Sequence, residues 1–398
     1  MKLRNNAYPW RWAAFFVCYY AANAAYQGYI SKYYQSAGAT NAQISILLAA
    51  APVVTVLVQP IWGALGDRVR SRNTLLRVLI LISAAFMALL PISKSFPWLM
   101  ALGVLFPAFY TSIQPMGDSI ILENLSQRNK PFGPMRLMGC FSFAIFNLCI
   151  GYAVGGRYIW IIFLTIALLL GTFGATFCLP ATPGHRRSGE KISMLDVFRL
   201  KGVAGLMVLF MMLQLCLGYF YSFFSIHFTS LPGGTSGLLG LAYFISASSE
   251  TPFLLFSDRL FEKLGAGKLM CISALTMLVR WTILASCTNV VVVLISQLLH
   301  GWGFIVMTVS MAKYINAVVP DALKSSGQML ISIGGYGVAR TFGILGGGLL
   351  SNAMGGTQQG FILTAVIAGL ALAIFAPRYL RQPPLNGHMQ ENAGTAQE

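Results

Sequence analysis

The sequence predicts an all-α membrane protein with twelve transmembrane helices in two pseudo-symmetric six-helix bundles. Three observations predict it: the scarcity of charge, the long apolar runs, and features that recur at one constant spacing. Of the 398 residues, 56% are hydrophobic and only 10% are charged, whereas a soluble domain carries about 25% charged residues. So few charges cannot cover a surface exposed to water, which excludes a soluble protein.

Twelve apolar runs reach the length of about 20 residues that a helix needs to cross a hydrocarbon core of about 30 Å. Gly38 marks the break between the first two runs, and Gly155 and Gly156 separate the fifth from the sixth. Outer-membrane barrels are excluded because their strands are short and alternating. The spans are expected near 12–32, 42–64, 73–93, 98–122, 134–155, 157–180, 203–228, 236–257, 268–288, 290–316, 325–350 and 358–377.

Basic residues predict the orientation of these spans. The chain has 27 Lys and Arg against 11 Asp and Glu; three of the 27 fall in outer loops, three within spans, and the others at cytoplasmic ends and loops. This asymmetry predicts that both termini are cytoplasmic, in the plasma membrane of a bacterium. The net charge of +16 does not indicate a nucleic-acid partner, because the basic residues are spread over many loops.

Features of the first half recur in the second half, which indicates a duplication. Asp67-Arg68 recurs as Asp258-Arg259, and Glu250 stands 191 residues after Gln59. Parallel six-helix repeats are typical of transporters that bind their substrate near the membrane midplane between the halves. We expect an N-terminal six-helix bundle at 1–180, a cytoplasmic linker at 181–202, a C-terminal six-helix bundle at 203–380 and a disordered cytoplasmic tail at 381–398.

The segment Gly63–Arg72 resembles the signature of the loop between helices two and three in the major facilitator superfamily. It keeps the first glycine, the Asp-Arg pair and the distal basic residues, but Arg70 stands where the pattern has a second glycine. A more degenerate copy follows at Ser257–Lys263. The alternative is a plain basic loop on the inner side of the membrane. The resemblance implies a conformational latch formed by Gly63, Asp67, Arg68, Asp258 and Arg259.

Six ionisable residues fall inside the predicted spans. A charge at the bilayer centre costs about 2.5–3.5 kcal/mol, so we expect most of the six to face a cavity and to form pairs. The alternatives are structural ion pairs between helices and, for Arg136 or Arg340, a side chain that reaches the membrane interface. The six residues are Asp118, Arg136, Glu250, Arg280, His300 and Arg340.

The fifth span resembles that of the lactose-permease-like branch of this superfamily. Arg136 is followed by Leu-Met-Gly-Cys-Phe-Ser-Phe143, and Asp118 stands 18 residues earlier, where that branch has a glutamate. The resemblance implies a sugar-binding set. Phe143 takes the position of a stacking tryptophan, which keeps an aromatic face but loses the indole N–H.

The ninth and tenth spans resemble those of the 3-phenylpropionate-permease-like transporters in the same branch. The segments that carry the likeness are Leu278-Val-Arg-Trp281 and Gln297-Leu-Leu-His-Gly301. The resemblance implies that Arg280 and His300 take part in proton coupling. Our hypothesis is that Glu250 takes the proton, because desolvation favours a neutral carboxylic acid, and that Arg280 and His300 tune it. Asp118 is a weaker candidate, because Arg136 is expected to hold it ionised.

Polar side chains form a stripe on otherwise apolar spans. In the first span Asn23, Tyr26 and Gln27 have helical spacing, and Gln214 stands 191 residues after Asn23. Amides and phenols suit the hydroxyl groups of a sugar or nucleoside, although they also hydrogen-bond neighbouring helices. The expected substrate-binding residues are Asn23, Tyr26, Gln27, Gln114, Asp118, Arg136, Phe143, Gln214 and Arg340.

These patterns together predict a secondary active transporter that imports a small polar solute with a proton by alternating access. The solute is expected to be a sugar, glycoside or nucleoside; the alternative is an aromatic carboxylate such as a phenylpropionate-like acid. A third hypothesis, from another class, is a non-transporting receptor or lipid-handling protein on the same fold.

The remaining patterns concern catalysis, metals and partners. A zinc-type histidine cluster and a nucleophile elbow are absent from the sequence, so we expect no enzyme. The seven cysteines form no Cys-x-x-Cys pair, so no metal site is expected. We expect no cofactor beyond the coupling proton. The expected partners are the small-molecule substrate, the proton and the lipid bilayer, and the protein is expected to be a monomer.

Overall fold

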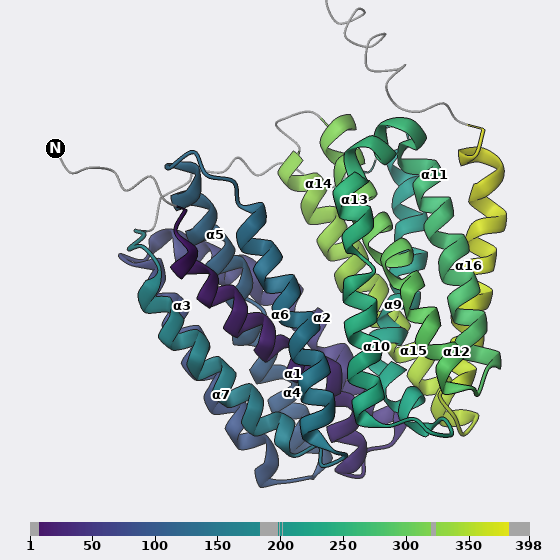
Figure 1. Cartoon of the computed structure of the whole chain (residues 1–398), viewed down its shortest axis with the longest axis horizontal. Helices are drawn as coiled ribbons and strands as arrows, with labels where there is room; N and C mark the ends of the chain where they lie inside the picture. The colour runs from purple at the N-terminus through teal and green to yellow at the C-terminus, as the bar shows by residue number, and fades with distance from the viewer. Residues whose placement is uncertain (1–7, 184–197, 199, 201, 320–323, 382–398) are drawn as a thin grey trace, which may run out of the picture. The chain divides into compact units, whose positions relative to one another are not determined.

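The computed structural model describes residues 8–183, 198, 200, 202–319 and 324–381, and every regular element in these ranges is a helix (Figure 1). The predicted all-α class is therefore confirmed. Most of the predicted linker 181–202 and nearly all of the predicted tail 381–398 lie outside the described residues.

The chain divides into two compact units. Unit 1 comprises Met1–Ala39 and Val54–Gly189, and unit 2 comprises Thr40–Val53 and Glu190–Glu398. The first part of the second helix thus groups with unit 2. The predicted bounds place the whole of this helix in the first bundle, because a continuous apolar helix gives no sequence signal of which unit it packs against.

Seven helices form the described part of unit 1, except that the start of α2 groups with unit 2. Ser71 begins α3 as an N-cap, and its hydroxyl accepts a hydrogen bond from the Thr74 amide at 3.4 Å. Gly139 lets α1 approach α6, because a Cβ there would lie 2.6 Å from the ring of Tyr20. The helices are α1 (Ala13–Ser36), α2 (Asn41–Arg68), α3 (Arg72–Leu89), α4 (Phe96–Tyr110), α5 (Ile113–Ser126), α6 (Gly133–Val154) and α7 (Trp160–Ala175).

Unit 2 contains two breaks in its helices that matter for the site. Gly265, with φ 72° and ψ 165°, interrupts α11 in a conformation that other residues rarely adopt. A π-helix, Ile331–Ala339, joins α14 to α15. The helices are α9 (Val203–Ser230), α10 (Ser236–Ser248), α11 (Thr251–Ser286), α12 (Val290–Ser296), α13 (His300–Val318), α14 (Lys324–Leu330), α15 (Arg340–Ala353) and α16 (Gln358–Tyr379).

The same packing pattern recurs in the two units. In unit 1, α1 packs against α6 and α7, and α3 packs against α5 and α7; in unit 2, α9 packs against α15 and α16, and α11 packs against α13 and α16. The α9–α15 contact is close because Gly343 has no side chain; a Cβ there would collide with the carbonyl oxygen of Leu215. The repeated contacts agree with the duplication that the sequence predicts.

Ten segments of the described chain are long and apolar enough to span a membrane. The segment Ser236–Ser286 has 51 residues and counts once among them, although Gly265 interrupts it. Helix α1, with 24 residues, is long enough to cross but is not among the ten, because its tyrosines, Asn23 and Gln27 lower its hydropathy. Twelve crossings follow if α1 spans once and Ser236–Ser286 spans twice.

Candidate transport site: ionisable clusters in the two units

In unit 1, the two charges predicted on consecutive spans form a pair. Asp118 on α5 and Arg136 on α6 lie 3.5 Å apart between Oδ2 and Nη1. Both side chains are partly buried, with 28% and 40% of their surface exposed. The other carboxylate oxygen of Asp118, Oδ1, is buried and has no hydrogen-bond partner among the described residues. The pair therefore keeps one acceptor unsatisfied.

Gln114 and Tyr20 complete this cluster around Arg136. The amide group of Gln114 lies 2.6 Å from Arg136 Nη1 and 3.1 Å from the Tyr20 hydroxyl. A guanidinium only donates, so the amide oxygen must face it, and this oxygen then also accepts from Tyr20. The Arg136 guanidinium lies 5.0 Å from the centre of the Tyr20 ring. Tyr20 was missed by sequence reasoning because a tyrosine in an apolar helix carries no charge signal.

The three polar residues predicted on α1 lie in different environments. The Asn23 side-chain oxygen accepts a hydrogen bond from Tyr110 at 3.2 Å, and the Tyr26 ring packs 5.5 Å from the same tyrosine. Gln27 is exposed. Phe143 is partly buried and lies two helical turns after Arg136 on α6. The contact of Asn23 with Tyr110 joins helices, which is the alternative role considered for these amides.

In unit 2, three of the predicted residues form a connected cluster. The Arg280 guanidinium lies 2.8 Å from His300 Nδ1, and His300 Nε2 lies 3.7 Å from Glu250 Oε1. The Tyr221 hydroxyl lies 3.1 Å from the same Nε2. The predicted neighbours on spans eight, nine and ten therefore lie together.

The contact with Arg280 fixes the protonation pattern of His300. Arginine can only donate, so Nδ1 of His300 must accept, and in the neutral ring the hydrogen then sits on Nε2. That N–H faces the Tyr221 hydroxyl and the Glu250 carboxyl group. Protonation of Nδ1 would set two donors against each other at 2.8 Å, so the contact with Arg280 disfavours a second proton on the His300 ring.

Both terminal nitrogens of Arg280 are engaged by neighbouring side chains, whereas its Nε has no hydrogen-bond partner among the described residues. Only 2% of the residue is exposed. One terminal nitrogen contacts His300, the other donates to the side-chain oxygen of Gln297, and the guanidinium lies 4.1 Å from the centre of the Phe220 ring. Gln297 was missed as a site residue, although it lies within the Gln297–Gly301 segment that carries the resemblance.

Arg340 has a different environment. Its Nε donates to the side-chain oxygen of Gln214 at 2.8 Å. The guanidinium lies 5.3 Å from the ring centre of Tyr221 and 4.8 Å from that of Tyr336. Its two terminal nitrogens make no hydrogen bond or ion pair with another residue that the structure describes.

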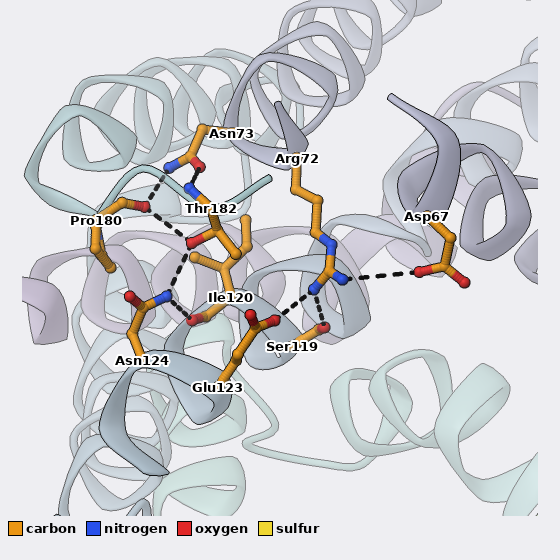
Figure 2. Close-up of polar contacts among 9 residues, drawn as sticks. All are labelled: Asp67, Arg72, Asn73, Ser119, Ile120, Glu123, Asn124, Pro180 and Thr182. Atoms are coloured by element: carbon orange, nitrogen blue, oxygen red, sulfur yellow. Dashed lines mark hydrogen bonds and ion pairs between the residues drawn. The ribbon is translucent and has the colours of Figure 1, made fainter. Parts of the chain in front are cut away.

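The predicted latch residue Asp67 lies near Arg72, which was not among the predicted latch residues. Arg72 at the start of α3 lies 3.8 Å from Asp67 and 2.8 Å from Glu123 on α5 (Figure 2). Arg72 also donates to the Ser119 hydroxyl at 3.3 Å. Arg68 is exposed, and a Cβ at Gly63 would meet nothing within 4 Å. Arg72 is thus the centre of the ionic contacts here.

The same end of α3 holds the chain that leaves α7. Asn73 donates to the Pro180 carbonyl and accepts from the Thr182 amide, both at 3.0 Å, and Asn124 donates to the Thr182 hydroxyl at 2.8 Å (Figure 2). These bonds fix the first residues of the predicted linker to α3 and α5.

The second copy of the loop feature is simpler. Asp258 lies 2.5 Å from Lys313 on α13, and its side chain is 87% exposed. Arg259 is exposed. Helix α13 packs against α11 in unit 2 as α5 packs against α3 in unit 1. Lys313 therefore lies on the helix that corresponds to α5, which carries Glu123. One direct pair thus replaces the three-residue set around Arg72.

The fold and its paired intramembrane charges define a multi-pass membrane transporter. The chain belongs to the MFS_1 like family, whose model matches residues 9–363. In the described residues, no group of three His, Cys, Asp or Glu side chains could hold a metal ion.

The chain is similar to named transporters over most of its length. It is 27% identical over 371 residues to the maltose permease of Geobacillus stearothermophilus, covering 92% of this chain and 93% of that protein. It is 25% identical to a protein of Escherichia coli strain K12 named "Probable 3-phenylpropionic acid transporter", covering 77% and 82%. A crystal structure of the nucleoside transporter NupG, 15% identical, matches with a TM-score of 0.82 over 94% of this chain and 99% of that one.

Proposed function

We propose that the protein imports a small polar solute together with protons, and that the solute is a sugar, glycoside or nucleoside. The observation that carries the proposal is the unit 1 cluster of Asp118, Arg136 and Gln114, in which Asp118 Oδ1 is buried without a partner. A buried acceptor without a donor is costly, and a solute hydroxyl supplies the donor. Maltose permease, with 27% identity, is a sugar transporter by name.

Glu250 is the proposed proton carrier. The proton arrives on its carboxyl group, while the neutral His300 ring, held by Arg280, presents its Nε2–H on the side of that group. Apart from the solute and the proton, this proposal involves no ligand and no cofactor. Proton binding and solute binding must then favour each other, since a symporter moves both in one cycle.

An aromatic carboxylate is the second candidate solute. The span interiors of unit 2 hold two arginines, Arg280 and Arg340, and a single carboxylate, Glu250, so an anionic solute would restore the balance of charge. The relative named for 3-phenylpropionic acid supports the same candidate. A non-transporting receptor on this fold is the alternative from another class.

The orientation and the latch belong to the same proposal. Both termini and the loops with Asp67 and Asp258 are cytoplasmic, and their pairs with Arg72 and Lys313 stabilise one state of the transport cycle. The protein acts as a monomer in a bacterial plasma membrane, with lipid as its surroundings.

Two measurements test the proposal. Purified protein is screened by thermal stability against sugars, nucleosides and aromatic acids, because a ligand that binds the folded state raises the melting temperature. Stabilisation by aromatic acids alone contradicts the sugar or nucleoside assignment. Proteoliposomes with an acidic exterior then separate the classes, since a symporter concentrates the solute inside and acidifies the lumen, whereas a receptor does neither.

A further inference from the structure

Arg340 carries a positive charge that forms no ion pair with the described residues of unit 2. The span interiors of unit 2 hold Arg280, Arg340 and Glu250, together with the neutral groups His300, Tyr221, Tyr243 and Tyr336. Arg280 is buried, and both its terminal nitrogens are bonded. Arg340 is partly exposed, and its terminal nitrogens meet no acceptor among the described residues. Of the two guanidinium groups, only that of Arg340 is free to receive an anion.

The surroundings of Arg340 hold its guanidinium group in one orientation. Its Nε is fixed by Gln214, and the rings of Tyr221 and Tyr336 lie 5.3 and 4.8 Å from its centre. Such aromatic contacts favour a cation and leave the two terminal nitrogens as a fork. A planar fork of this kind matches the two oxygens of a carboxylate.

Gln214 adds a second unsatisfied donor to the same pair. Its side-chain oxygen accepts from Arg340, and its amide nitrogen Nε2 is buried with no hydrogen-bond partner among the residues that the structure describes, on a residue that is 0% exposed. An unpaired buried donor is costly, and an acceptor from a ligand removes the cost. The terminal nitrogens of Arg340 and Nε2 of Gln214 thus both lack an acceptor within the part of the chain that the structure describes.

The backbone that leads into Arg340 is unusual. The π-helix Ile331–Ala339 ends directly before it and carries Tyr336. Segments of π-helix are rare and frequently occur at functional sites, because they cost hydrogen-bond geometry that the fold must offset. The π-helix thus carries one of the flanking rings, and the guanidinium lies on the first residue of the helix that follows it.

We infer that Arg340 and Gln214 form a carboxylate-binding site, and that the transported solute carries one anionic carboxylate. This inference rests on the proposed transport function and narrows it. It favours a sugar acid over a neutral sugar, because the carboxylate supplies the acceptor that the terminal nitrogens of Arg340 and Nε2 of Gln214 lack. The aromatic acid remains an outcome of the test.

Matched pairs of acid and amide test the inference directly. The probes are D-glucuronate with D-glucuronamide and 3-phenylpropionate with 3-phenylpropionamide, each measured by thermal shift and by dissociation constant. We expect one acid to bind at least about 30-fold more tightly than its amide, since loss of a buried charge partner has about this effect. Equal binding of acid and amide, or binding of neither acid, overturns the inference.

Three variants assign the preference to this site. Arg340→Gln is expected to reduce the acid preference to below about 3-fold. Gln214→Glu places a carboxylate beside the guanidinium, so it is expected to fold with unchanged or higher stability and to lose acid binding, which covers the case in which Arg340→Gln does not fold. Arg378→Gln removes an exposed arginine at the end of α16 and is expected to keep the preference. Acid binding by Gln214→Glu at the wild-type level overturns the inference.

The binding test is independent of transport. If the protein binds acids through Arg340 but does not concentrate them, the transport proposal fails and the carboxylate site stands. If proteoliposomes concentrate a neutral sugar and Arg340→Gln does so equally well, the carboxylate inference fails and the transport proposal stands.

Discussion

Arg72 and Glu123 form an ion pair at 2.8 Å, the closest among the described residues of unit 1, and the same arginine lies 3.8 Å from Asp67. Only 8% of the Arg72 side chain is exposed, whereas 44% of Asp67 is. The buried arginine is thus held mainly by Glu123, and Asp67 is the weaker, more exposed partner. A latch that opens during transport can release Asp67 while Arg72 stays on Glu123.

Removing the Arg72 guanidinium is expected to destabilise unit 1. Arg72→Gln leaves Glu123 without its charged partner, and we expect a loss of about 1–3 kcal/mol of unfolding free energy in detergent. Arg68→Gln changes an exposed neighbour and is expected to stay within about 0.5 kcal/mol of the wild type. Equal stability of the two variants contradicts the central position of Arg72.

The pair of Asp118 and Arg136 predicts energetic coupling between α5 and α6. A double-mutant cycle of Asp118→Asn and Arg136→Gln is expected to give a coupling energy of about 0.5–3 kcal/mol, because each single change strands the other group. The cycle is measured by unfolding of the purified protein. Strictly additive effects would show that the two side chains do not interact.

The contact between Arg280 and His300 predicts a single tautomer. Nitrogen-15 spectra of histidine-labelled protein in nanodiscs should show His300 at neutral pH with Nε2 protonated and Nδ1 bare. The spectrum of a His300→Gln variant identifies the signal. A ring with the proton on Nδ1 would mean that Arg280 does not donate to it.

Two neighbouring glycines in α15 provide a matched test of the helix packing. Gly343→Ala places a Cβ against the backbone of Leu215, and we expect about 1–3 kcal/mol of destabilisation. Gly346→Ala meets nothing within 4 Å and is expected to be tolerated. Equal free energies of unfolding for the two variants would show that α9 and α15 do not approach closely at Gly343.

The sequence predicted the charged members of the two ionisable clusters better than their neutral neighbours. In a chain with 10% charged residues, Asp118, Arg136, Glu250, Arg280 and His300 stand out, because each charge inside a span needs a partner. The pairing of Asp118 with Arg136 followed from the short connection between their helices, and the neighbourhood of Glu250, Arg280 and His300 followed from the family resemblance.

Neutral partners could not be predicted in the same way. Tyr20, Tyr221 and Tyr336 are three of 16 tyrosines, and nothing in the sequence separates those that touch a guanidinium from those that face lipid. The π-helix before Arg340 was also missed, because the glycines of that segment fit an ordinary packed helix equally well. Lys313, 55 residues from Asp258, became a partner only through the fold.

Proton-driven accumulation through Glu250 is the central claim of this account. The direct measurement is uptake of the most strongly stabilising solute, in radiolabelled form, into proteoliposomes with an acidic exterior. Wild-type protein and Glu262→Gln, which changes an exposed acid on α11, should concentrate the solute. Glu250→Gln should exchange solute across the membrane without concentrating it; accumulation by Glu250→Gln at the wild-type level would contradict the claim.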